Sequence, residues 1–331
     1  MGASRVGRII RHVRRLVTLL SLAVLAVPAS AAALLTPGRT VPNVAPVPVL
    51  SVTHRSVVWA VGQSKRDCGH VRLWDTATGG LWTFGSRTIR GCEEGPSGGF
   101  GIGQVATSGR RVFWVTHIGG NITDYQLWTA TPSRPGPRRL AFESAETDGP
   151  VPIVLGGGTR DGVPYAIGRT VTLVSDSGAR LFRVTLDAPV RLLASGTGPG
   201  KARVVAALED GSVVTLSDRG AVLRTNEFDP GPVRAIAIGL PGALVQVGNV
   251  VHVGSADVTL PAGALMLDYR QRQIVYRKGT QARMRHIATG ADRLLRVIPV
   301  KSWQPMPFST DSWGSGWATG RTVSWRSGPL R

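Results

Sequence analysis

From residue 48 onward, hydrophobic and polar positions alternate in short runs, and turn-forming residues separate the runs. The first runs cover residues 56–61, 70–75 and 81–84, with residues such as Gly, Asp and Ser between them. Alternation with a period of two is typical of strands, and the longer period of a helix is almost absent. The pattern therefore predicts an all-β protein made of short strands and tight turns.

The runs recur as a repeating unit of four strands. Residues 111–115, 125–129 and 139–142 repeat the order of strands two to four in the first unit. The third and fourth units share a Ser-Asp-x-Gly turn in the same register, at 175–178 and 217–220. Two further units follow, so the sequence predicts a repeat architecture.

The end of the chain supplies only part of a seventh unit. Residues 313–318 and 321–325 look like strands that lack a fourth partner, and we expect a strand near residues 43–49 to complete their sheet. Sharing one blade between the two chain ends is how a β-propeller closes its ring. We therefore predict a β-propeller over residues 48–331, with seven four-stranded blades of about 40 residues each. Six blades is the alternative, because the fifth unit, residues 233–261, is short.

Three segments show a similarity to known propellers. They are residues 109–114 (Gly-Arg-Arg-Val-Phe-Trp), residues 161–165 (Asp-Gly-Val-Pro-Tyr) and the Trp74-Asp75 pair at the end of a third strand. In these features the chain resembles TolB-like and WD-repeat-like propeller blades, over nearly all of residues 48–331. The Asp-Gly pair before the second strand appears only in some units. The resemblance implies the fold and very little about function.

The first 31 residues have the three zones of a secretory signal peptide. Five arginines without an acid are followed by the apolar run Leu16–Val27 and by small residues. An uncleaved membrane anchor is the alternative, although Pro28 interrupts the run before the roughly 20 residues of a span. Either reading predicts that the remaining chain is secreted or extracytoplasmic, at the cell envelope. Residues 32–47, rich in proline, are expected to form an extended lead-in that holds the closing strand.

The chain carries a formal charge of +19, and removing the five arginines of the signal leaves +14. An anionic partner such as a cell-wall polymer, an acidic glycan or a lipid headgroup would explain this surplus. Composition is the other explanation, because lysine occurs at only four positions and the arginines are spread along the chain. Nucleic-acid binding is not expected, since no recognition motif is present.

Two cysteines, Cys68 and Cys92, follow the predicted signal. In an exported protein such a pair predicts a disulfide. A metal site made of both cysteines and His70 is the alternative, but the paired-cysteine spacing of zinc motifs is absent. We therefore expect a disulfide and no metal.

The nine tryptophans all lie before residue 129 or after residue 302, so ring closure would gather them in blades seven, one and two. Most are expected in the core, whereas Trp303 and Trp313 lie near loops. The longest predicted loops belong to the same sector and to one face of the ring, at residues 62–69, 86–100, 117–124, 143–150 and 299–308. Long loops on a rigid scaffold are usual sites of binding. The predicted binding face comprises His70, Arg87, Arg90, Glu93, Glu94, His117, Asn121, Asp124, Trp303 and Trp313.

These features predict a monomeric, non-catalytic binding protein without a cofactor. The first hypothesis is a protein-interaction or scaffolding module at the cell envelope. The second is a module that binds a cell-wall glycan through Trp303, Trp313 and nearby arginines. A propeller enzyme, such as a lyase or glycosidase, is a third hypothesis, against which no converging set of carboxylate, tyrosine and histidine side chains is evident.

Overall fold

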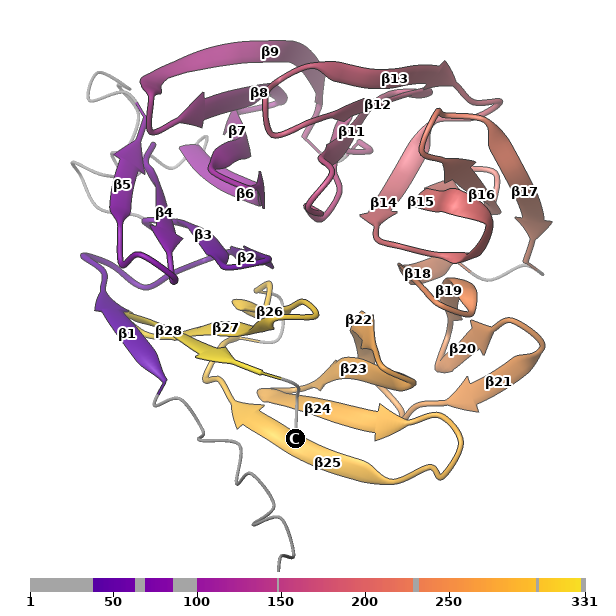
Figure 1. Ribbon diagram of the computed structural model, residues 1–331. Helices are drawn as coiled ribbons and strands as arrows, with labels where there is room; N and C mark the ends of the chain where they lie inside the picture. The colour runs from indigo at the N-terminus through magenta and orange to yellow at the C-terminus, as the bar shows by residue number, and fades with distance from the viewer. Residues whose placement is uncertain are drawn as a thin grey trace, which may run out of the picture. The chain divides into compact units, whose positions relative to one another are not determined.

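The fold was analysed in a computed structural model of the 331-residue chain. It describes residues 38–62, 69–85, 100–147, 149–228, 232–301 and 304–328. These residues form 28 strands, which pair into seven four-stranded antiparallel sheets, and one short 3-10 helix at Pro199–Lys201. The sheets stand around a common centre as the blades of a ring (Figure 1). The predicted seven-bladed β-propeller is confirmed, and the six-bladed alternative is wrong.

In the first six blades, four strands follow one another along the chain and pair in that order. The strands of blades 1 to 3 are β2 (Leu50–Thr53), β3 (Ser56–Ala60), β4 (Val71–Asp75), β5 (Leu81–Phe84), β6 (Phe100–Ser108), β7 (Arg111–Gly119), β8 (Ile122–Thr131), β9 (Arg134–Glu146), β10 (Ile153–Leu155), β11 (Val163–Ile167), β12 (Thr170–Val174) and β13 (Arg180–Thr185). The strands of blades 4 to 6 are β14 (Val190–Ser195), β15 (Ala202–Leu208), β16 (Ser212–Ser217), β17 (Val222–Glu227), β18 (Val233–Gly239), β19 (Gly242–Val247), β20 (Val250–Val253), β21 (Ala256–Thr259), β22 (Leu265–Arg270), β23 (Gln273–Lys278), β24 (Gln281–His286) and β25 (Asp292–Val297). Within the described residues, no helix is long and apolar enough to cross a membrane.

Blade 7 is built from both ends of the chain. It contains β26 (Phe308–Thr310), β27 (Gly314–Thr319), β28 (Thr322–Ser327) and, as its outer strand, β1 (Arg39–Pro42). β1 pairs with β28 in an antiparallel register that sets Val41 opposite Val323. The closing strand therefore lies a few residues before the predicted 43–49. Pro46 and Pro48 explain the difference, because proline has no N–H group to donate to a neighbouring strand.

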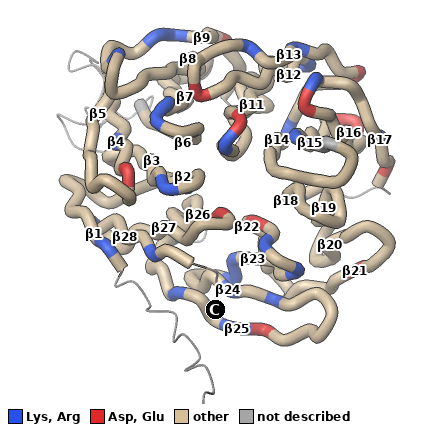
Figure 2. Tube along the Cα trace, viewed as in Figure 1, with Lys and Arg blue, Asp and Glu red and all other residues tan. Residues whose placement is uncertain are grey.

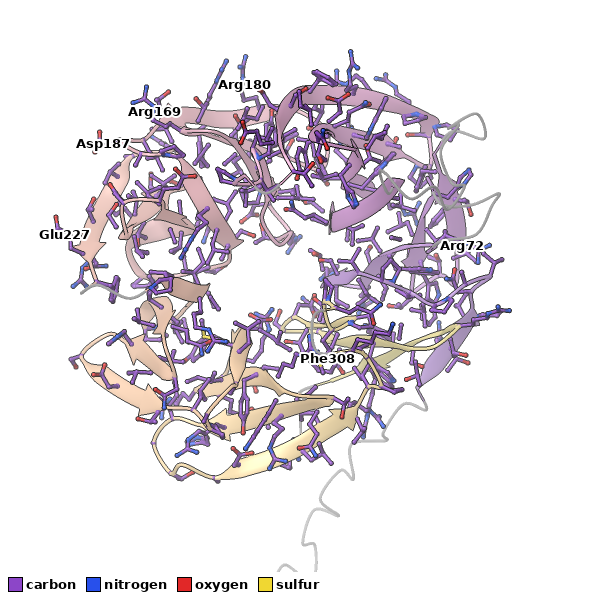
Figure 3. All side chains as sticks on the ribbon, turned by 180° about the vertical axis from the view of Figure 1, so that it is seen from behind. Arg72, Arg169, Arg180, Asp187, Glu227 and Phe308 are labelled. Atoms are coloured by element: carbon purple, nitrogen blue, oxygen red, sulfur yellow. The ribbon has the colours of Figure 1, made fainter. Side chains whose placement is uncertain are left out.

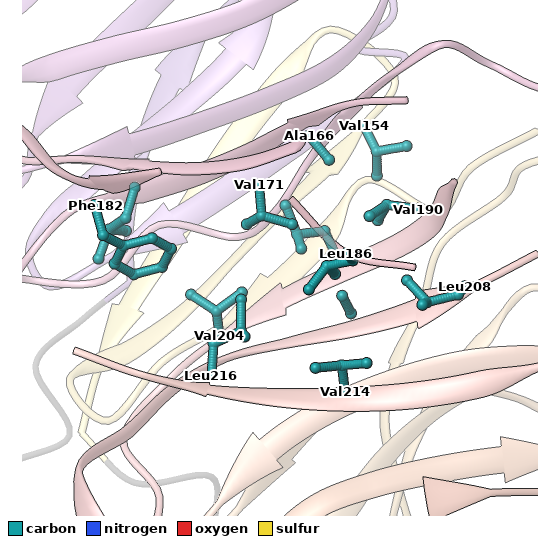
Figure 4. Packing of buried hydrophobic residues seen from close by; sticks show 13 residues of the cluster. Val154, Ala166, Val171, Phe182, Leu186, Val190, Val204, Leu208, Val214 and Leu216 are labelled. Atoms are coloured by element: carbon teal, nitrogen blue, oxygen red, sulfur yellow. The ribbon is translucent and has the colours of Figure 1, made fainter. Parts of the chain in front are cut away.

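The core lies between neighbouring blades, and strand alternation explains it. In β15, Val204 and Ala206 belong to the cluster between blades 3 and 4, which Figure 4 shows from close by. The intervening Val205 and Ala207 belong to the cluster between blades 4 and 5. All four side chains are fully buried. A strand whose two faces both pack on neighbours needs apolar residues at successive positions, and burying each valine contributes about 1.5–3 kcal/mol.

The repeated Ser-Asp-x-Gly segments form equivalent turns in blades 3 and 4. The Gly178 N–H donates to the Ser175 carbonyl at 3.0 Å, and the Gly220 N–H donates to the Ser217 carbonyl at 3.1 Å. The φ angles of the two glycines are 90° and 79°. Glycine adopts such angles without a steric cost, which explains its place at the end of each segment.

Blade 2 has longer strands than the sequence suggests. β7, β8 and β9 contain 9, 10 and 13 residues. Residues 117–124 are therefore not a long loop, because only a Gly120–Asn121 turn separates β7 from β8. Half of the predicted loop 143–150 is also strand, since β9 continues to Glu146. In the first stretch, the β-branched residues Ile118, Ile122 and Thr123 flank the turn, and Gly-Asn suits a two-residue hairpin turn.

Candidate functional site

The two ends of every blade carry different turns. Because neighbouring strands are antiparallel, the turn between strands one and two emerges at the opposite end from the turn between strands two and three. We call the end that carries the turns between strands one and two the 1–2 face. Those turns include residues 54–55, 156–162, 240–241, 271–272 and 311–313. The other end, with the turns between strands two and three and the blade-to-blade connections, is the 2–3 face.

Four predicted site residues lie at or near the ends of strands that are directed toward the 2–3 face. His70 lies directly before β4 and is buried, whereas Asn121 is exposed in the turn between β7 and β8. His117 packs against Gly101 of β6, and burial lowers the pKa of its imidazole. The Asp124 carboxylate accepts a 2.6 Å hydrogen bond from a serine hydroxyl of β9. These contacts are accounted for by the packing of blades 1 and 2.

The other residues predicted for that face fall outside the described residues. They are Arg87, Arg90, Glu93, Glu94 and Trp303. The same holds for Cys68 and Cys92, so their disulfide stays a prediction.

The structure places Trp313 on the 1–2 face, away from the residues with which the sequence grouped it. Trp313 lies in the turn between β26 and β27, and 45% of its surface is exposed. The sequence pattern grouped it with the connection 299–308, which precedes blade 7. β26, at 308–310, crosses the blade between that connection and Trp313. One strand carries the chain from one face to the other. Trp313 therefore lies on the 1–2 face, whereas the other described residues of the predicted binding face lie toward the 2–3 face.

The 1–2 face is hollowed at the end of the ring axis. A cavity of about 360 Å³ opens there, and the last residues of four innermost strands line it: Thr53, Ser195, Gly239 and Arg270. The turns between strands one and two add further lining residues, among them His54, Arg160, Leu240, Gln271 and Trp313. Six of the seven blades thus contribute to this cavity, which we call the axial funnel.

The loop 156–162, Gly-Gly-Gly-Thr-Arg-Asp-Gly, forms one wall of the axial funnel. It is directed toward the middle of the ring (Figure 1). Thr53 Oγ1 of blade 1 donates to the Gly158 carbonyl at 3.1 Å. Ser195 Oγ of blade 4 donates to the Gly157 carbonyl. A Cβ atom on Gly158 would lie 1.7 Å from the Thr107 carbonyl oxygen of blade 2. The loop is therefore held by three blades besides its own, and it covers the end of β6.

Trp313 stands at the rim of the axial funnel, beside blade 1. Its ring meets the His54 ring at an interplanar angle of 82°, with 4.4 Å between centroids. The Arg55 guanidinium lies 5.5 Å from the centroid of the indole. Asp311 Oδ1 accepts hydrogen bonds from the Trp313 N–H at 2.8 Å and from the Gly314 N–H at 2.9 Å. This Asx turn and the contacts with blade 1 fix an exposed tryptophan in one position.

Two ionisable groups of the rim have shifted pKa values. Burial, followed by the positive charges of Arg55 and Arg160, lowers the pKa of His54, so its imidazole is neutral at neutral pH. Burial raises the pKa of Asp311 to about 6, although backbone N–H donors and Arg270 oppose this shift. The charged residues that line the axial funnel are Arg160, Arg270 and one carboxylate, Asp311, which binds a proton more tightly than an exposed Asp does.

Below the rim, a polar network joins blades 6 and 7. Asp268 forms a 2.6 Å ion pair with Arg270 and accepts a 3.0 Å hydrogen bond from Thr310 Oγ1. Arg270 in turn donates to Thr310 Oγ1 at 3.1 Å. Burial raises the pKa of Asp268, and the arginine opposes that shift. Because each member already has a partner, this network supports the funnel wall.

A second cavity, of about 350 Å³, lies between blades 4 and 5. Its lining includes Phe228 and His252, whose rings are 5.3 Å apart, and His252 forms a 2.7 Å contact with Asp257. Only two blades form this cavity, whereas six converge on the axial funnel. Among the described residues, no group of three or more His, Cys, Asp or Glu side chains could hold a metal ion. We therefore take the axial funnel as the candidate site, a surface suited to binding.

No protein-family model and no curated protein matches the sequence. Solved structures match in fold. Raptor of Chaetomium thermophilum matches over 88% of this chain with a TM-score of 0.51 and 14% identity, and this chain covers 28% of the Raptor chain. A chain of a mitotic checkpoint complex matches over 89% of this chain and 92% of its own length, with a TM-score of 0.53 and 13% identity. In fold, the chain is a seven-bladed β-propeller.

Most of the axial funnel of this propeller was not predicted from the sequence. His54, Arg55, Arg160, Leu240 and Asp311 did not appear among the predicted site residues. Predicted loop length directed attention to the 2–3 face, whereas most turns of the funnel contain only two or three residues. The triple glycine before Arg160 was the available signal, because it marks a longer turn directly after an innermost strand.

Proposed function

We propose that the protein is a non-catalytic protein-interaction module or scaffold of the cell envelope, and that its partner docks on the axial funnel. The observation that supports this best is the exposed Trp313, fixed between Arg55 and His54 at the rim. Tryptophan and arginine dominate the hot spots of protein interfaces. Leu240, which lines the same cavity and is 80% exposed, adds an aliphatic anchor.

The construction of the axial funnel also favours binding. Its turns are short, and loop 156–162 is hydrogen-bonded to blades 1 and 4. A surface ordered before binding loses little conformational entropy when the partner arrives. The similar chain in the mitotic checkpoint complex belongs to a protein assembly, which agrees with such a role.

The extracytoplasmic setting is part of the proposal. The basic and apolar zones of residues 1–31 and the pair Cys68 and Cys92 support it. Fractionation of cells that produce a C-terminally tagged chain, followed by N-terminal sequencing, tests it. A mature protein that begins directly after Ala31 or Ala33 supports a cleaved signal, and a full-length membrane-bound chain supports the anchor. A full-length chain in the cytoplasm contradicts export.

Photo-crosslinking tests the docking surface. A photoreactive amino acid is placed at Leu240 on the 1–2 face and, as a control, at Ile122, which is 64% exposed at the opposite end of the ring. One dominant protein adduct from position 240 in cells, lost in a Trp313→Ala background, is the expected result. A dominant adduct from position 122 together with none from position 240 would show that partners use the other face.

Glycan binding is the second candidate, and the exposure of Trp313 favours it, because a tryptophan ring stacks on a sugar face. A cell-wall pull-down or glycan array tests it directly. Retention that depends on Trp313 and is unaffected by Trp82→Ala, a substitution in β5, would support this candidate. Retention that is the same in both variants would remove Trp313 from any sugar site.

A further inference from the structure

Two exposed arginines, Arg55 and Arg160, lie at the axial funnel. Arg55 follows β2 in blade 1, and Arg160 lies in the loop after β10 in blade 3. Both are exposed, and within the described residues neither guanidinium has a carboxylate at ion-pair distance. Lys and Arg are otherwise distributed around the whole ring (Figure 2). Of the two, Arg160 lines the axial funnel, and Arg55 directly follows His54, which lines it.

The positive charges of Arg55 and Arg160 both reach His54 at the rim of the axial funnel. Both lower the pKa of His54, so both positive charges are felt at the same imidazole. The Arg55 guanidinium lies over the Trp313 ring, which lines the axial funnel. Ser108 Oγ of blade 2 donates to the Arg160 carbonyl at 3.3 Å, which fixes the backbone from which that side chain extends. An anion in the axial funnel would therefore meet two guanidinium groups held on separate blades.

One carboxylate, Asp311, lines the axial funnel, and a second, Asp268, lies below its rim. Asp311 Oδ1 accepts from two backbone N–H groups of its own turn, and Oδ2 is buried. Asp268 is paired with Arg270. Neither acid is presented to a ligand, so the charge available to a partner is positive. A partner carboxylate would gain charge-assisted hydrogen bonds from Arg55 and Arg160.

Apolar groups beside these charges distinguish a peptide from a sugar. Leu240 and Ile238 of blade 5 line the axial funnel, and Trp313 of blade 7 lines it as well. An exposed aliphatic side chain such as Leu240 gains by contact with another apolar side chain, about 25 cal/mol for each Å² covered. Sugar hydroxyls offer no such gain against leucine. Alternating acidic and apolar side chains of a peptide would meet both kinds of group.

We propose that the axial funnel binds an acidic peptide segment, in which Asp or Glu side chains pair with Arg55 and Arg160 and a neighbouring apolar side chain packs between Trp313 and Leu240. This inference rests on the proposed protein-interaction function and names the chemistry of the partner.

Peptide selection tests the inference on the full mature chain. A random dodecamer phage library is selected on the immobilised protein, and the enriched peptides are expected to carry Asp or Glu next to Leu, Ile or Phe. For a fluorescent selected peptide, Arg55→Gln with Arg160→Gln should weaken binding at least about tenfold. Raising the salt concentration from 0.05 M to 0.5 M should weaken it as well, because exposed charges are screened. Replacing Asp and Glu in the peptide by Asn and Gln should reproduce the loss.

A matched variant provides the control. Arg169 and Arg321 are exposed arginines in turns on the 2–3 face, and Arg169 points away from the ring (Figure 3). Arg169→Gln with Arg321→Gln removes the same charge from the protein and should leave the affinity within about twofold. An equal loss in this control would show that only net charge matters, and it would overturn the inference.

Other outcomes separate this inference from the proposed function. Selected peptides that require Trp313 but contain no acids would overturn the inference and leave a protein-interaction role standing. A selection that returns no peptide dependent on Trp313 would count against both. Displacement of a selected peptide by a uronic-acid oligosaccharide at lower concentration than by free peptide would assign the arginines to a glycan, which also overturns the inference.

Discussion

The Asn43 side-chain oxygen accepts a 3.1 Å hydrogen bond from the indole N–H of Trp59, which is fully buried in blade 1. The Asn43 side-chain N–H group also donates to the carbonyls of Ala45 and Val61, each at 2.7 Å. One buried amide therefore fastens the segment after β1 to the neighbouring blade. This contact lies at the junction where the ring closes.

Replacing this amide is expected to destabilise the ring. Asn43→Ala leaves the Trp59 N–H and two carbonyls without their partner, and the free energy of unfolding should fall by about 3 kcal/mol. Urea denaturation followed by tryptophan fluorescence measures the change. Asn121→Ala, an exposed position in the β7–β8 turn, is the control and should change the free energy by less than about 0.5 kcal/mol. Equal stability of the two variants would mean that Asn43 does not secure the junction.

The contact between His54 and Trp313 joins blade 1 to blade 7. A double-mutant cycle with His54→Asn and Trp313→Leu should give a coupling energy of about 0.5–1.5 kcal/mol. Asparagine is chosen because the φ of His54 is 57°, an angle that asparagine tolerates. His54→Asn combined with Phe228→Leu, a residue lining the cavity between blades 4 and 5, should be additive. A vanishing coupling in the first cycle would mean that the ring contact adds nothing to closure.

The Asp311 carboxyl makes stability depend on pH. Its pKa is raised from 3.8 to about 6 in the folded protein, so the folded state binds the proton more tightly than the unfolded state. This group's contribution is therefore fully present below pH 4 and is lost as the pH rises through 6. Asp311→Asn keeps the acceptor oxygen, so at pH 7.5 the variant should be more stable than the wild type, by up to about 3 kcal/mol.

Thermal unfolding at pH 4.5 and 7.5 checks this expectation. The advantage of Asp311→Asn should shrink toward the lower pH. Asp187→Asn serves as the control, because Asp187 is exposed and points outward from the ring (Figure 3). If the advantage of Asp311→Asn were the same at both pH values, the carboxyl would not titrate in this window.

Two adjacent glycines in loop 156–162 should respond very differently to alanine. A Cβ atom on Gly158 would lie 1.7 Å from the Thr107 carbonyl oxygen, whereas a Cβ on Gly157 meets nothing within 4 Å. Gly158→Ala should cost about 2–3 kcal/mol by overpacking, which lowers the melting temperature by about 5 °C or more. Gly157→Ala should leave the melting temperature nearly unchanged. Similar melting temperatures for both variants would mean that the loop moves freely and does not wall the axial funnel.

The sequence predicted the fold well because strand alternation and turns are local properties. The Ser-Asp-x-Gly turns lie where they were expected, and the incomplete blade at the C-terminus does receive a strand from the N-terminus. The strand lies a few residues earlier than predicted, because Pro46 and Pro48 lack the N–H groups that a paired strand needs. The length of blade 2 was underestimated where glycine and polar residues interrupted the apolar pattern at 117–124.

The candidate site was harder to predict, because convergence on the ring axis is not a local property. Arg55 and Arg160 are separated by 105 positions in the sequence and by one intervening blade in the fold. Trp313 was predicted to lie near a loop and does lie in an exposed turn, but its face depends on where the three-residue strand β26 begins. A strand this short gives a weak alternation signal, so the sequence alone could not fix the end of the blade at which Trp313 emerges.

During synthesis β1 leaves the ribosome long before its partner β28, since Val41 and Val323 stand at opposite ends of the chain. Until the last blade is synthesised, β1 has no partner strand, and its backbone N–H and C=O groups are unpaired. Unpaired strands of this kind can pair with a strand of another chain. Its composition reduces that hazard. β1 contains only four residues, begins with Arg39 and ends with Pro42, and both a charge and a proline discourage intermolecular pairing. The strand that closes the ring is therefore protected against intermolecular pairing until β28 is synthesised.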